Sequence, residues 1–518
     1  MRNNIDLEES PSARRRSYQR GVSLATWSRL SPHRLAIRST KGNRTFSELD
    51  TNCNRLARAL ADRGVRVDDG LALICANRPE FVEVMFAAER AGIRVTPIPS
   101  DSTPREVEYM IDDSGATAII ADATVSPGVA HLASQRAGMK ARLSIGAETS
   151  ALESYHSALN SADAHPFEAG TMGIPMLYTS STTGSPKGVY RREPVSRSAM
   201  VTLAEQLRLS SKYDKALAPL PLGRVFNLSV RLPLVSGVEV LLSEELDPNR
   251  LLDLIAQNGI TYAYLTPFLL HRLAQLPVSA RKNYDLRSLR NVLHTGAPCA
   301  VPLKRQMIEW LGPIITECYA GTEGGDVVIS SEDWLRKPGS VGKADDRVVI
   351  LDEDGKTLPP NTIGRIFLTA PERGRFEYFN EPEKTRAAYY EDRFTMGDHG
   401  YLDQDGYLFL TGRSTEIINS GGLKIYPAEI EAVLLTHSCV EDAACIGVPD
   451  AEMGEKVKAL IKLLPERRSE DGLSVGIKHH CSEHLAPYKG PSEFEFVEEI
   501  PRLPSGKLLR DLLRQRYC

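Results

Sequence analysis

A segment rich in hydroxyl side chains, residues 178–189, has the residue types that most directly indicate chemistry. Hydroxyls, exposed backbone amides and an ammonium all donate hydrogen bonds, so such a segment is suited to binding an oxyanion. A polyphosphate is the ligand that this set of donors predicts. The residues expected to contact it are Thr179, Ser180, Ser181, Thr182, Thr183, Gly184 and Lys187.

The alternative interpretation of this composition is a flexible Ser/Gly linker. Against a linker, an apolar run at residues 174–177 leads into the segment, and Lys187 runs directly on to Val189. The segment also differs from the common phosphate loop G-x-x-x-x-G-K-[ST], because only three residues separate Gly184 from Gly188 and the lysine precedes its glycine. A phosphate loop of another class is therefore indicated.

The elements that position this loop come from a long chain of ordinary composition. With 518 residues, 42% hydrophobic and 25% charged, we expect two to four folded units. The net charge of −4 gives no support to a nucleic-acid partner, and no uncharged apolar run reaches the length of a transmembrane helix. Eight cysteines without a C-x-x-C pair favour a reducing cytoplasm over a disulfide framework or a thiolate zinc site.

Helix and strand signals alternate in the first part of the chain. A capping box at Ser47 and Asp50 opens a helix whose apolar residues follow at helical spacing up to a glycine cap at Gly64. Residues 71–75 and 95–98 read as strands on either side of a second helix at 79–90, which a proline opens. This alternation recurs further along the chain and predicts α/β subdomains of the doubly wound type.

The later part of the chain changes character. Short β-rich stretches with turn residues follow Gly364, and the last hundred residues carry their own helix and strand signals. We therefore expect a flexible tail at 1–24, a large N-terminal domain at 25–413 with a β-rich subdomain, a hinge at 414–416 and a small, mobile α+β domain at 417–518. The tail carries Arg14 to Arg16 but no apolar segment behind them, so a secretory signal is not expected.

The order of residues in 178–189 resembles the phosphate loop of the adenylate-forming superfamily, which includes acyl-CoA synthetases, luciferases and the adenylation domains of peptide synthetases. The resemblance covers roughly residues 25 to 515. Residues 297–299 and 307–313 look most like fatty-acyl and bile-acid-type CoA synthetases. The resemblance implies binding of ATP and its AMP product by the loop.

Two further glycine-containing segments match the superfamily. Small residues at 296–297 let a purine approach the backbone, and an aromatic ring at Tyr319 offers a stacking surface. The resemblance implies that Thr322 touches the α-phosphate and that Glu323 holds Mg²⁺, for which a carboxylate oxygen is a suitable ligand. The nucleotide-binding residues expected here are Gly296, Ala297, Pro298, Tyr319, Ala320 and Gly321.

Two charged positions nearer the C-terminus complete the resemblance. Asp398 lies in a glycine-flanked segment where the superfamily binds both ribose hydroxyls, and Arg413 resembles the arginine that also meets the ribose. Lys507, in a Pro-Ser-Gly-Lys motif, resembles the small-domain lysine that bridges the carboxylate and the phosphates. A cation suits that position because it lowers the repulsion between two anions that must react.

The remaining expected site residues follow from the same resemblance. Arg224, Val225, Phe226, Asn227, Thr295 and Gly324 are expected to line the acyl pocket, which lacks the family's common Phe-His pair. Ser420, Gly421 and Gly422 resemble the glycine loop that lets pantetheine pass. Thr415 stands at the hinge, where the family usually has Asp or Lys. Ser181 and Ala320 replace glycines of the family pattern.

These residues predict an acid:CoA ligase that uses ATP, Mg²⁺ and CoA. It would convert an apolar carboxylic acid, bulky ones included, to acyl-AMP with release of pyrophosphate, and then to the CoA thioester. One alternative is a stand-alone adenylating enzyme that supplies a carrier protein or a separate acyltransferase, as in natural-product biosynthesis. The other is a catalytically silent nucleotide-binding scaffold, against which the joint presence of Lys187, Glu323, Asp398, Arg413 and Lys507 argues. The sequence leaves the acid open, and a homo-oligomer is possible.

A histidine-rich segment at 479–484 has some features of a metal site. His480 and His484 share a helical face at metal-ligand spacing. Without a third ligand in view, an exposed helix is favoured over a metal site, and no metal is assigned there.

Overall fold

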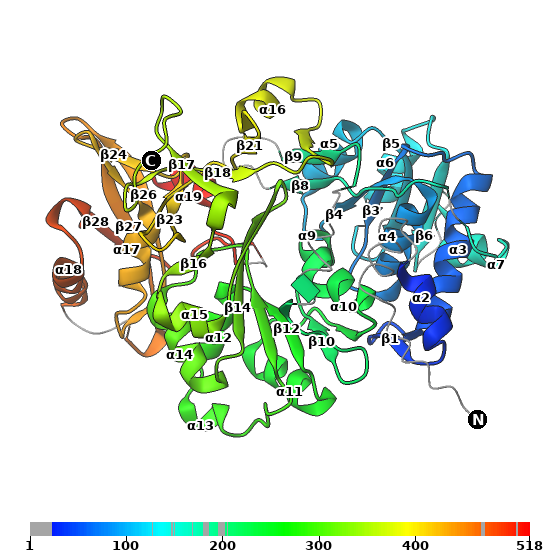
Figure 1. Cartoon of the computed structure of the whole chain (residues 1–518), viewed down its shortest axis with the longest axis horizontal. Helices are drawn as coiled ribbons and strands as arrows, with labels where there is room; N and C mark the ends of the chain where they lie inside the picture. Colours follow the sequence, from blue (N-terminus) through cyan, green and yellow to red (C-terminus); the bar gives the residue numbers. More distant parts are fainter. Residues whose placement is uncertain are drawn as a thin grey trace.

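The computed structural model describes residues 23–126, 128–146, 149, 151–167, 169–179, 186–194, 203–204, 206–467, 472–503 and 506–518. In Figure 1 the chain runs from an N-terminal α/β part (blue and cyan, right) through a central α/β part (green) to a small C-terminal domain (orange and red, left). The structure therefore has the predicted α/β class, with a large domain followed by a small one.

The first sheet is parallel throughout and has the strand order β4-β3-β5-β6-β7. Every residue of α4 is buried, which fits a helix enclosed on all sides. The strands are β3 (Gly70–Ile74), β4 (Arg94–Ile98), β5 (Ala116–Asp122), β6 (Ala141–Ile145) and β7 (Glu153–Ser154). The helices are α3 (Phe46–Asp62), α4 (Pro79–Ala91), α5 (Pro104–Asp113), α6 (Val129–Ser134) and α7 (Tyr155–Asn160).

The second sheet has the order β15-β14-β13-β12-β10-β11-β1-β2, parallel except at its two edge strands. Its strands are β1 (Leu35–Arg38), β2 (Arg44–Thr45), β10 (Lys215–Ala218), β11 (Glu239–Leu242), β12 (Tyr262–Leu265), β13 (Asn291–His294), β14 (Ile315–Gly321) and β15 (Gly324–Ile329). Its helices are α2 (Ser23–Leu30), α9 (Leu222–Phe226), the π-helix η1 (Asn227–Arg231), α10 (Leu232–Val235), α11 (Pro248–Asn258), α12 (Pro267–Ala274), α13 (Val278–Arg281), α14 (Val301–Leu311) and α15 (Ser331–Arg336).

Two antiparallel sheets complete the large domain. The larger has β16 (Ser340–Lys343), β17 (Val348–Leu351), β18 (Gly364–Thr369), β20 (Tyr389–Tyr390), β21 (Arg393–Phe394), β22 (Asp398–Leu402) and β23 (Tyr407–Arg413), with η2 (Asp345–Arg347) and α16 (Pro382–Ala388) in its connections. The smaller joins β8 (Leu177–Thr179), β9 (Lys187–Arg191) and β19 (Phe376–Tyr378) in the order β19-β9-β8. It therefore links segments that lie almost 200 residues apart in the chain.

The small domain has its own sheet and its own hydrophobic core, which includes Ile418, Ile430 and Ile461. Its strands are β24 (Ile418–Ser420), β25 (Leu423–Ile425), β26 (Val440–Asp450), β27 (Gly454–Leu463) and β28 (Glu493–Phe496). Its helices are α17 (Pro427–Leu434), η3 (Pro465–Arg467), α18 (Leu473–His484), η4 (Pro487–Lys489) and α19 (Arg510–Tyr517). A separate core is what a domain that moves as a unit requires.

The capping box predicted for α3 was placed two residues too late. The structure forms it with Thr45 and Glu48: the Thr45 side chain accepts from the Glu48 amide, and Glu48 accepts from the Thr45 amide at 2.8 Å. Glu is long enough to reach back to the N-cap, whereas Asp50 pairs with Arg90 instead. The sequence T-F-S-E therefore matches the motif better than S-E-L-D.

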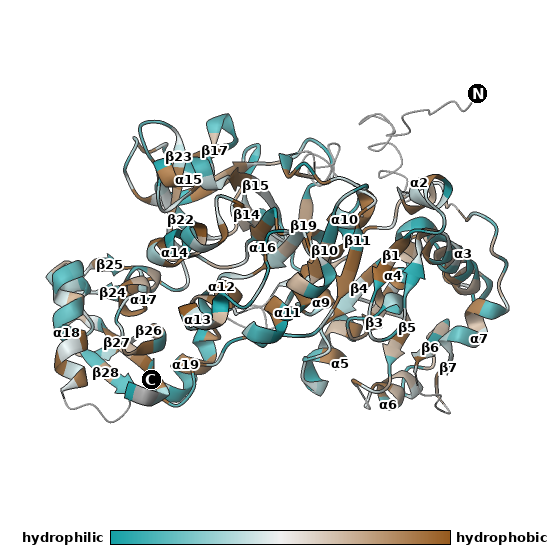
Figure 2. Ribbon diagram, turned by 90° about the horizontal axis from the view of Figure 1, so that it is seen from below, coloured by the Kyte–Doolittle hydropathy of each residue, from teal (hydrophilic) through white to brown (hydrophobic). Residues whose placement is uncertain are grey.

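Hydropathy follows the layers. Figure 2 shows strands such as β10 and β11 in brown and the outlying α18 mostly in teal.

The apolar run at 174–177 gives a strand only from Leu177. Among the described helices, none is both long and apolar enough to cross a lipid bilayer. All eight cysteines are free thiols.

Candidate active site

A cavity of about 930 Å³ brings together residues from the large domain and one loop of the small domain. Sixteen of the residues singled out from the sequence line it. They are Thr179, Lys187, Arg224, Val225, Phe226, Asn227, Thr295, Gly296, Ala320, Gly321, Thr322, Glu323, Arg413, Ser414, Thr415 and Lys507. Segments separated by more than 300 residues in sequence thus meet at one place.

The phosphate-loop segment is the connection of the hairpin β8–β9. Thr179 pairs with Lys187 across this hairpin, and both line the cavity. The predicted ligands Ser180, Ser181, Thr182, Thr183 and Gly184 lie outside the described residues, and their roles remain predictions.

The turn between β14 and β15 carries Thr322 and Glu323. Gly321 pairs with Gly324 across this turn, so the two functional candidates occupy its tip. Arg191 holds the turn from β9, because its Nη2 donates to the carbonyl oxygens of Thr322 at 3.1 Å and Glu323 at 2.6 Å. The backbone of the predicted metal-binding turn is therefore tied to the strand that carries Lys187.

Tyr378, on β19, was not identified from the sequence. Its hydroxyl donates to Glu323 Oε1 at 2.9 Å, and Lys187 Nζ lies 5.2 Å from the centroid of its ring. Burial and the neighbouring Glu323 carboxylate raise the pKa of Tyr378, so its hydroxyl keeps its proton and remains a donor. Tyr378 thus contacts both Glu323 and Lys187, two residues expected to bind the nucleotide and its metal ion.

Asp398 and Arg413 face each other across the strand pair β22–β23, with Asp398 Oδ1 at 3.1 Å from Arg413 Nε. The Tyr319 hydroxyl donates a hydrogen bond to the other carboxylate oxygen, Asp398 Oδ2, at 2.8 Å. Burial raises the pKa of Asp398, while Arg413 opposes that shift. Tyr319 is buried and is not among the residues that line the cavity, so stacking of its ring on a purine remains a prediction.

Lys507 enters the cavity on a tight turn of the small domain. The turn is closed by hydrogen bonds from the Leu503 amide to the Lys507 carbonyl and from the Gly506 amide to the Leu503 carbonyl, at 2.8 and 2.7 Å. Burial, together with the nearby Arg413, lowers the pKa of Lys507 to about 8, against the opposing effect of Glu416 and Glu323. A cation from the small domain is thus held in the same cavity as the phosphate-loop lysine.

The predicted acyl-pocket segment 224–227 forms α9 and the start of the π-helix η1, and all four residues line the cavity. A π-helix inserts an extra residue into a turn and is frequent at functional sites. Arg224 is fixed by Asp101, with Nη2 3.0 Å from Oδ1. Phe226 packs against Phe81 and Phe86 with ring centroids 5.7 and 6.0 Å apart.

The wall near this segment is mostly apolar and includes residues that the sequence did not indicate. These are Met85, Met172, Leu203, Gln206, Leu228, Arg231, Tyr264 and Thr266. Arg231 forms a buried ion pair with Glu89, with Nη1 2.7 Å from Oε1. Burial raises the pKa of Glu89 to about 7, and the neighbouring arginines oppose that shift. Among the other predicted residues, Ala297, Pro298, Gly324 and Asp398 do not line the cavity.

The predicted CoA-path residues lie apart from the cavity. Ser420 pairs with Leu423 in the hairpin β24–β25, and Gly421 and Gly422 form its exposed tip with positive φ angles of 56° and 82°. Only glycine adopts two consecutive left-handed conformations at little cost, which suits a two-residue hairpin. None of the three lines the cavity in this arrangement.

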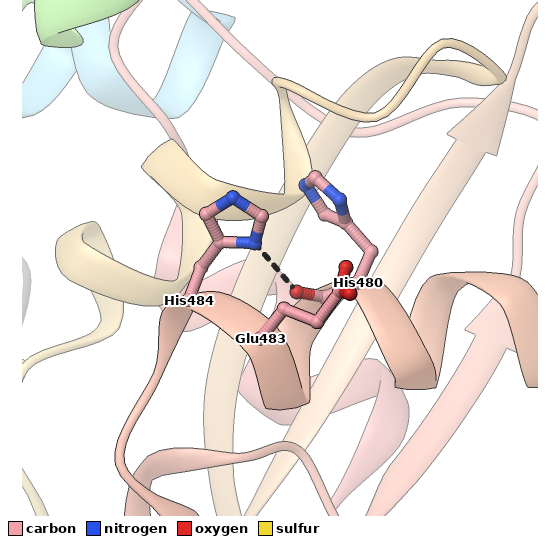
Figure 3. A group of neighbouring side chains, drawn as sticks. All are labelled: His480, Glu483 and His484. Atoms are coloured by element: carbon pink, nitrogen blue, oxygen red, sulfur yellow. Dashed lines mark hydrogen bonds between the residues drawn. The ribbon is translucent and has the colours of Figure 1, made fainter.

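The histidine cluster lies on α18 of the small domain. Figure 3 shows His480, Glu483 and His484 in the last turn of α18, each with a ligand atom within 4.8 Å of the others. Glu483 is thus a third candidate ligand that the sequence reading did not count. His480 Nε2 lies 2.8 Å from Thr436 Oγ1, and His484 Nδ1 donates to the His480 carbonyl at 2.9 Å. Because Glu483 and His484 are exposed, and exposed groups of this kind are common on protein surfaces without a metal, we assign no metal to this cluster.

A two-domain α/β protein whose cavity has the Lys187 hairpin of the large domain on one side and a lysine of the small domain on the other has the arrangement of an adenylate-forming enzyme. The chain belongs to the family described as AMP-binding enzyme, whose model matches residues 24–374. The model described as the AMP-binding enzyme C-terminal domain matches residues 429–507 and so includes Lys507.

Named relatives share nearly the whole chain. The long-chain-fatty-acid–CoA ligase FadD13 of Mycobacterium tuberculosis is 32% identical, covering 92% of this chain and 94% of that protein. The fatty acid–[acyl-carrier-protein] ligase ScoC of Streptomyces coeruleorubidus is 29% identical and covers 91% of both. The crystal structure of the anthranilate CoA ligase AuaEII with anthranoyl-AMP superposes with a TM-score of 0.85 at 26% identity, covering 95% of this chain and 96% of that one.

Proposed function

We propose that this protein is an AMP-forming acid:CoA ligase. In the first half-reaction a carboxylate attacks the α-phosphorus of ATP, the bond to the β-phosphate breaks, and acyl-AMP and pyrophosphate result. In the second, the CoA thiol loses its proton and displaces AMP to give the thioester. The observation that carries the proposal is the position of Lys507, a small-domain residue that lines the same cavity as Glu323 and Lys187.

The nucleotide is held by groups from three sheets. Lys187 and the phosphate-loop donors bind the β- and γ-phosphates, and Thr322 contacts the α-phosphate. Asp398 accepts hydrogen bonds from the ribose hydroxyls, for which its two oxygens are suited, and Arg413 keeps it ionised despite burial, since the ion pair favours the charged form. Lys507 stabilises the negative charge that builds up between the attacking carboxylate and the phosphates.

Glu323 fits the role of a Mg²⁺ ligand. Its carboxylate lines the cavity, and hydrogen bonding at one oxygen, from Tyr378, leaves the other oxygen, Oε2, available to a cation. Mg²⁺ bound there would neutralise phosphate charge, which is its usual contribution in nucleotide sites. The protein's own part is to hold that carboxylate beside the phosphate-loop lysine.

The acid is an apolar one with room for a bulky group. Met85, Met172, Leu203 and Phe226 form an apolar wall, while Asn227 and the Arg231–Glu89 pair supply a small number of polar groups. Pockets of this composition bind mostly apolar ligands and use few polar groups to orient them. The relatives range from a fatty-acid ligase to an anthranilate ligase, so the acid has to be found by experiment.

The second candidate is a stand-alone adenylating enzyme that passes its acyl group to a carrier protein. Similarity to ScoC, whose name is that of an acyl-carrier-protein ligase, favours keeping it. Thr415 at the hinge, in place of the Asp or Lys typical of the superfamily, is the residue of this chain that bears on it.

We further propose that the enzyme works in a reducing cytoplasm, which the eight free thiols support.

The test is pyrophosphate release with a panel of acids that runs from short chains to polycyclic acids, with ATP and Mg²⁺. We expect release that depends on one class of apolar acid, and thioester formation when CoA is added. Pyrophosphate without thioester identifies the carrier-dependent alternative. Absence of acid-dependent release across the panel contradicts the proposal.

A further inference from the structure

One face of the sheet β19-β9-β8 carries four side chains that line the cavity. Lys187, Val189 and Arg191 alternate along β9, so they project from the same face of the strand. Tyr378 is paired with Val189 across the ladder and therefore lies between Lys187 and Arg191 on that face. All four residues line the cavity.

Two of these side chains already hold the turn that carries Glu323. Arg191 binds the turn's backbone carbonyls, which fixes where the turn lies, but it does not touch the Glu323 carboxylate. Tyr378 does, through the 2.9 Å hydrogen bond from its hydroxyl to Oε1. The orientation of the carboxylate is thus set by Tyr378, and the position of its backbone by Arg191.

The same ring supports the phosphate-loop lysine. Lys187 Nζ lies 5.2 Å from the centroid of the Tyr378 ring, within the range of a cation–π contact. Among the described residues, no carboxylate lies within 4.0 Å of Lys187 Nζ. A direct Lys187–Glu323 ion pair would occupy both charges with each other, whereas a tyrosine between them keeps each available for a ligand.

We propose that Tyr378 is a positioning residue that holds Glu323 and Lys187 in a fixed relation, so that the metal ligand and the phosphate-binding cation act as one preformed set. The inference rests on the proposed function, because it assigns these two residues to Mg²⁺ and ATP. Tyr378 itself does not react. Its effect passes through Glu323 by way of the hydroxyl and through Lys187 by way of the ring.

A purely structural role has to be separated from this one, because Tyr378 also packs edge-on against Phe376 with ring centroids 5.3 Å apart. The variant Tyr378→Phe keeps the ring, and with it the packing and the contact to Lys187, and removes only the hydroxyl. Tyr389→Phe is the matched control: the Tyr389 hydroxyl donates to the Phe376 carbonyl at 2.8 Å, in the same sheet region but away from Glu323.

The measurement is the affinity for Mn²⁺, used as the probe for Mg²⁺, in the presence of α,β-methylene-ATP and followed by electron paramagnetic resonance. We expect Tyr378→Phe to weaken Mn²⁺ binding about tenfold, the size expected for a lost hydrogen bond to a charged group. Tyr389→Phe should bind Mn²⁺ as the wild type does. In Tyr378→Leu, the nucleotide analogue itself should also bind several-fold more weakly, since the support of Lys187 is lost.

A double variant shows whether the hydroxyl acts through Glu323. In a Glu323→Gln background, Tyr378→Phe should add no further loss of Mn²⁺ affinity, because the interaction it removes is already absent. Equal Mn²⁺ affinity in Tyr378→Phe and wild type, or full additivity in the double variant, overturns the inference. Failure of the proposed function is seen separately, as wild-type protein that shows no acid-dependent pyrophosphate exchange.

Discussion

The small domain presents two loops of different kinds, and only one of them is in the cavity. The turn at 503–507 carries Lys507 into the cavity, where burial lowers the pKa of that lysine to about 8. The hairpin tip at Gly421 and Gly422 is exposed, and no residue of it lines the cavity. In this arrangement Lys507, the residue expected to act in adenylation, lies in the cavity, whereas Gly421 and Gly422, which are expected to act in transfer to CoA, lie outside it.

The contacts of the two loops explain the difference. Gly506 lies so close to Phe268 of α12 that a Cβ added there would be 2.1 Å from the Phe268 Cβ. The hairpin β24–β25 reaches the large domain through the exposed ion pair between Lys424 and Glu353, at 2.9 Å. The lysine turn is therefore docked by close packing and the hairpin by a weak surface contact.

From this comparison we propose that the enzyme uses two faces of its small domain in turn. The turn 414–416 connects β23 of the large domain to β24 of the small domain, and rotation there would exchange one loop for the other at the cavity. Changes to the 503–507 turn should impair the first half-reaction alone, and changes to the hairpin tip the second alone.

The largest effect is expected from Lys507→Ala. Loss of the cation removes the charge that stabilises the adenylation transition state, so acid-dependent ATP–pyrophosphate exchange should slow by on the order of 10²–10³-fold. Full exchange activity in this variant would contradict the assignment of Lys507 to the adenylation step.

Gly506→Ala tests docking without altering a charge. The added Cβ would overlap Phe268, and the residue has a φ of 84°, which an L side chain rarely adopts. We expect exchange to slow by roughly 10-fold or more, since displacement of a catalytic group by about 1 Å can cost up to 10²-fold. Gly490→Ala, a substitution in the same domain where the nearest atom is 3.5 Å from the added Cβ, is the control and should keep its exchange rate.

The pKa of Lys507 predicts a pH dependence of the same step. The ammonium is the active form, and with a pKa of about 8 it is lost as pH rises through that value. The kcat/KM for ATP should therefore fall about fivefold between pH 8 and pH 9, reporting the free enzyme. Lys507→Arg, whose guanidinium stays charged, should be slower but should show no such fall; an unchanged decline in that variant assigns the titration to another group.

Gly421→Ala addresses the other loop. The new Cβ would lie 2.4 Å from Met453 Cε, at a residue with a φ of 56°. We expect thioester formation to slow by roughly 3- to 10-fold, on the scale of about 1 kcal/mol of backbone strain, with pyrophosphate exchange unchanged. Slowing of exchange to the same extent would remove the distinction between the loops.

The smallest effect is expected from Glu353→Gln, which removes the exposed ion pair with Lys424. Surface ion pairs are worth about 0–1 kcal/mol, so rates of exchange and thioester formation should change by no more than about fivefold, in opposite directions. The two rates measured side by side at low and at 0.5 M salt check this, because salt should abolish the difference between variant and wild type.

The elements with local signals were predictable from the sequence. The strand at 70–74, the helix at 79–91 and the strand at 94–98 follow apolar runs and a helix-starting proline, and they lie within a residue or so of their predicted ends. The capping box of α3 was misplaced because two overlapping segments fit the motif, and only the helix start decides between them.

Residues that act through long-range pairing were not predictable. Tyr378 contacts Glu323 and Lys187 only because β19 pairs with β9 from almost 190 residues away, and nothing in its local sequence indicates that pairing. Arg191 had a usable signal, since alternation along a strand places it on the same face as Lys187. The apolar wall of Met85 and Met172 is likewise formed by packing between subdomains.

Presenting purified acyl-AMP and CoA to the wild type and to Lys507→Ala tests the central claim most directly. If the 503–507 turn serves adenylation and the hairpin serves transfer, both proteins should form thioester at similar rates, although the variant has lost pyrophosphate exchange. If thioester formation is lost together with exchange, then Lys507 acts in both steps, and the division of labour between the two loops is wrong.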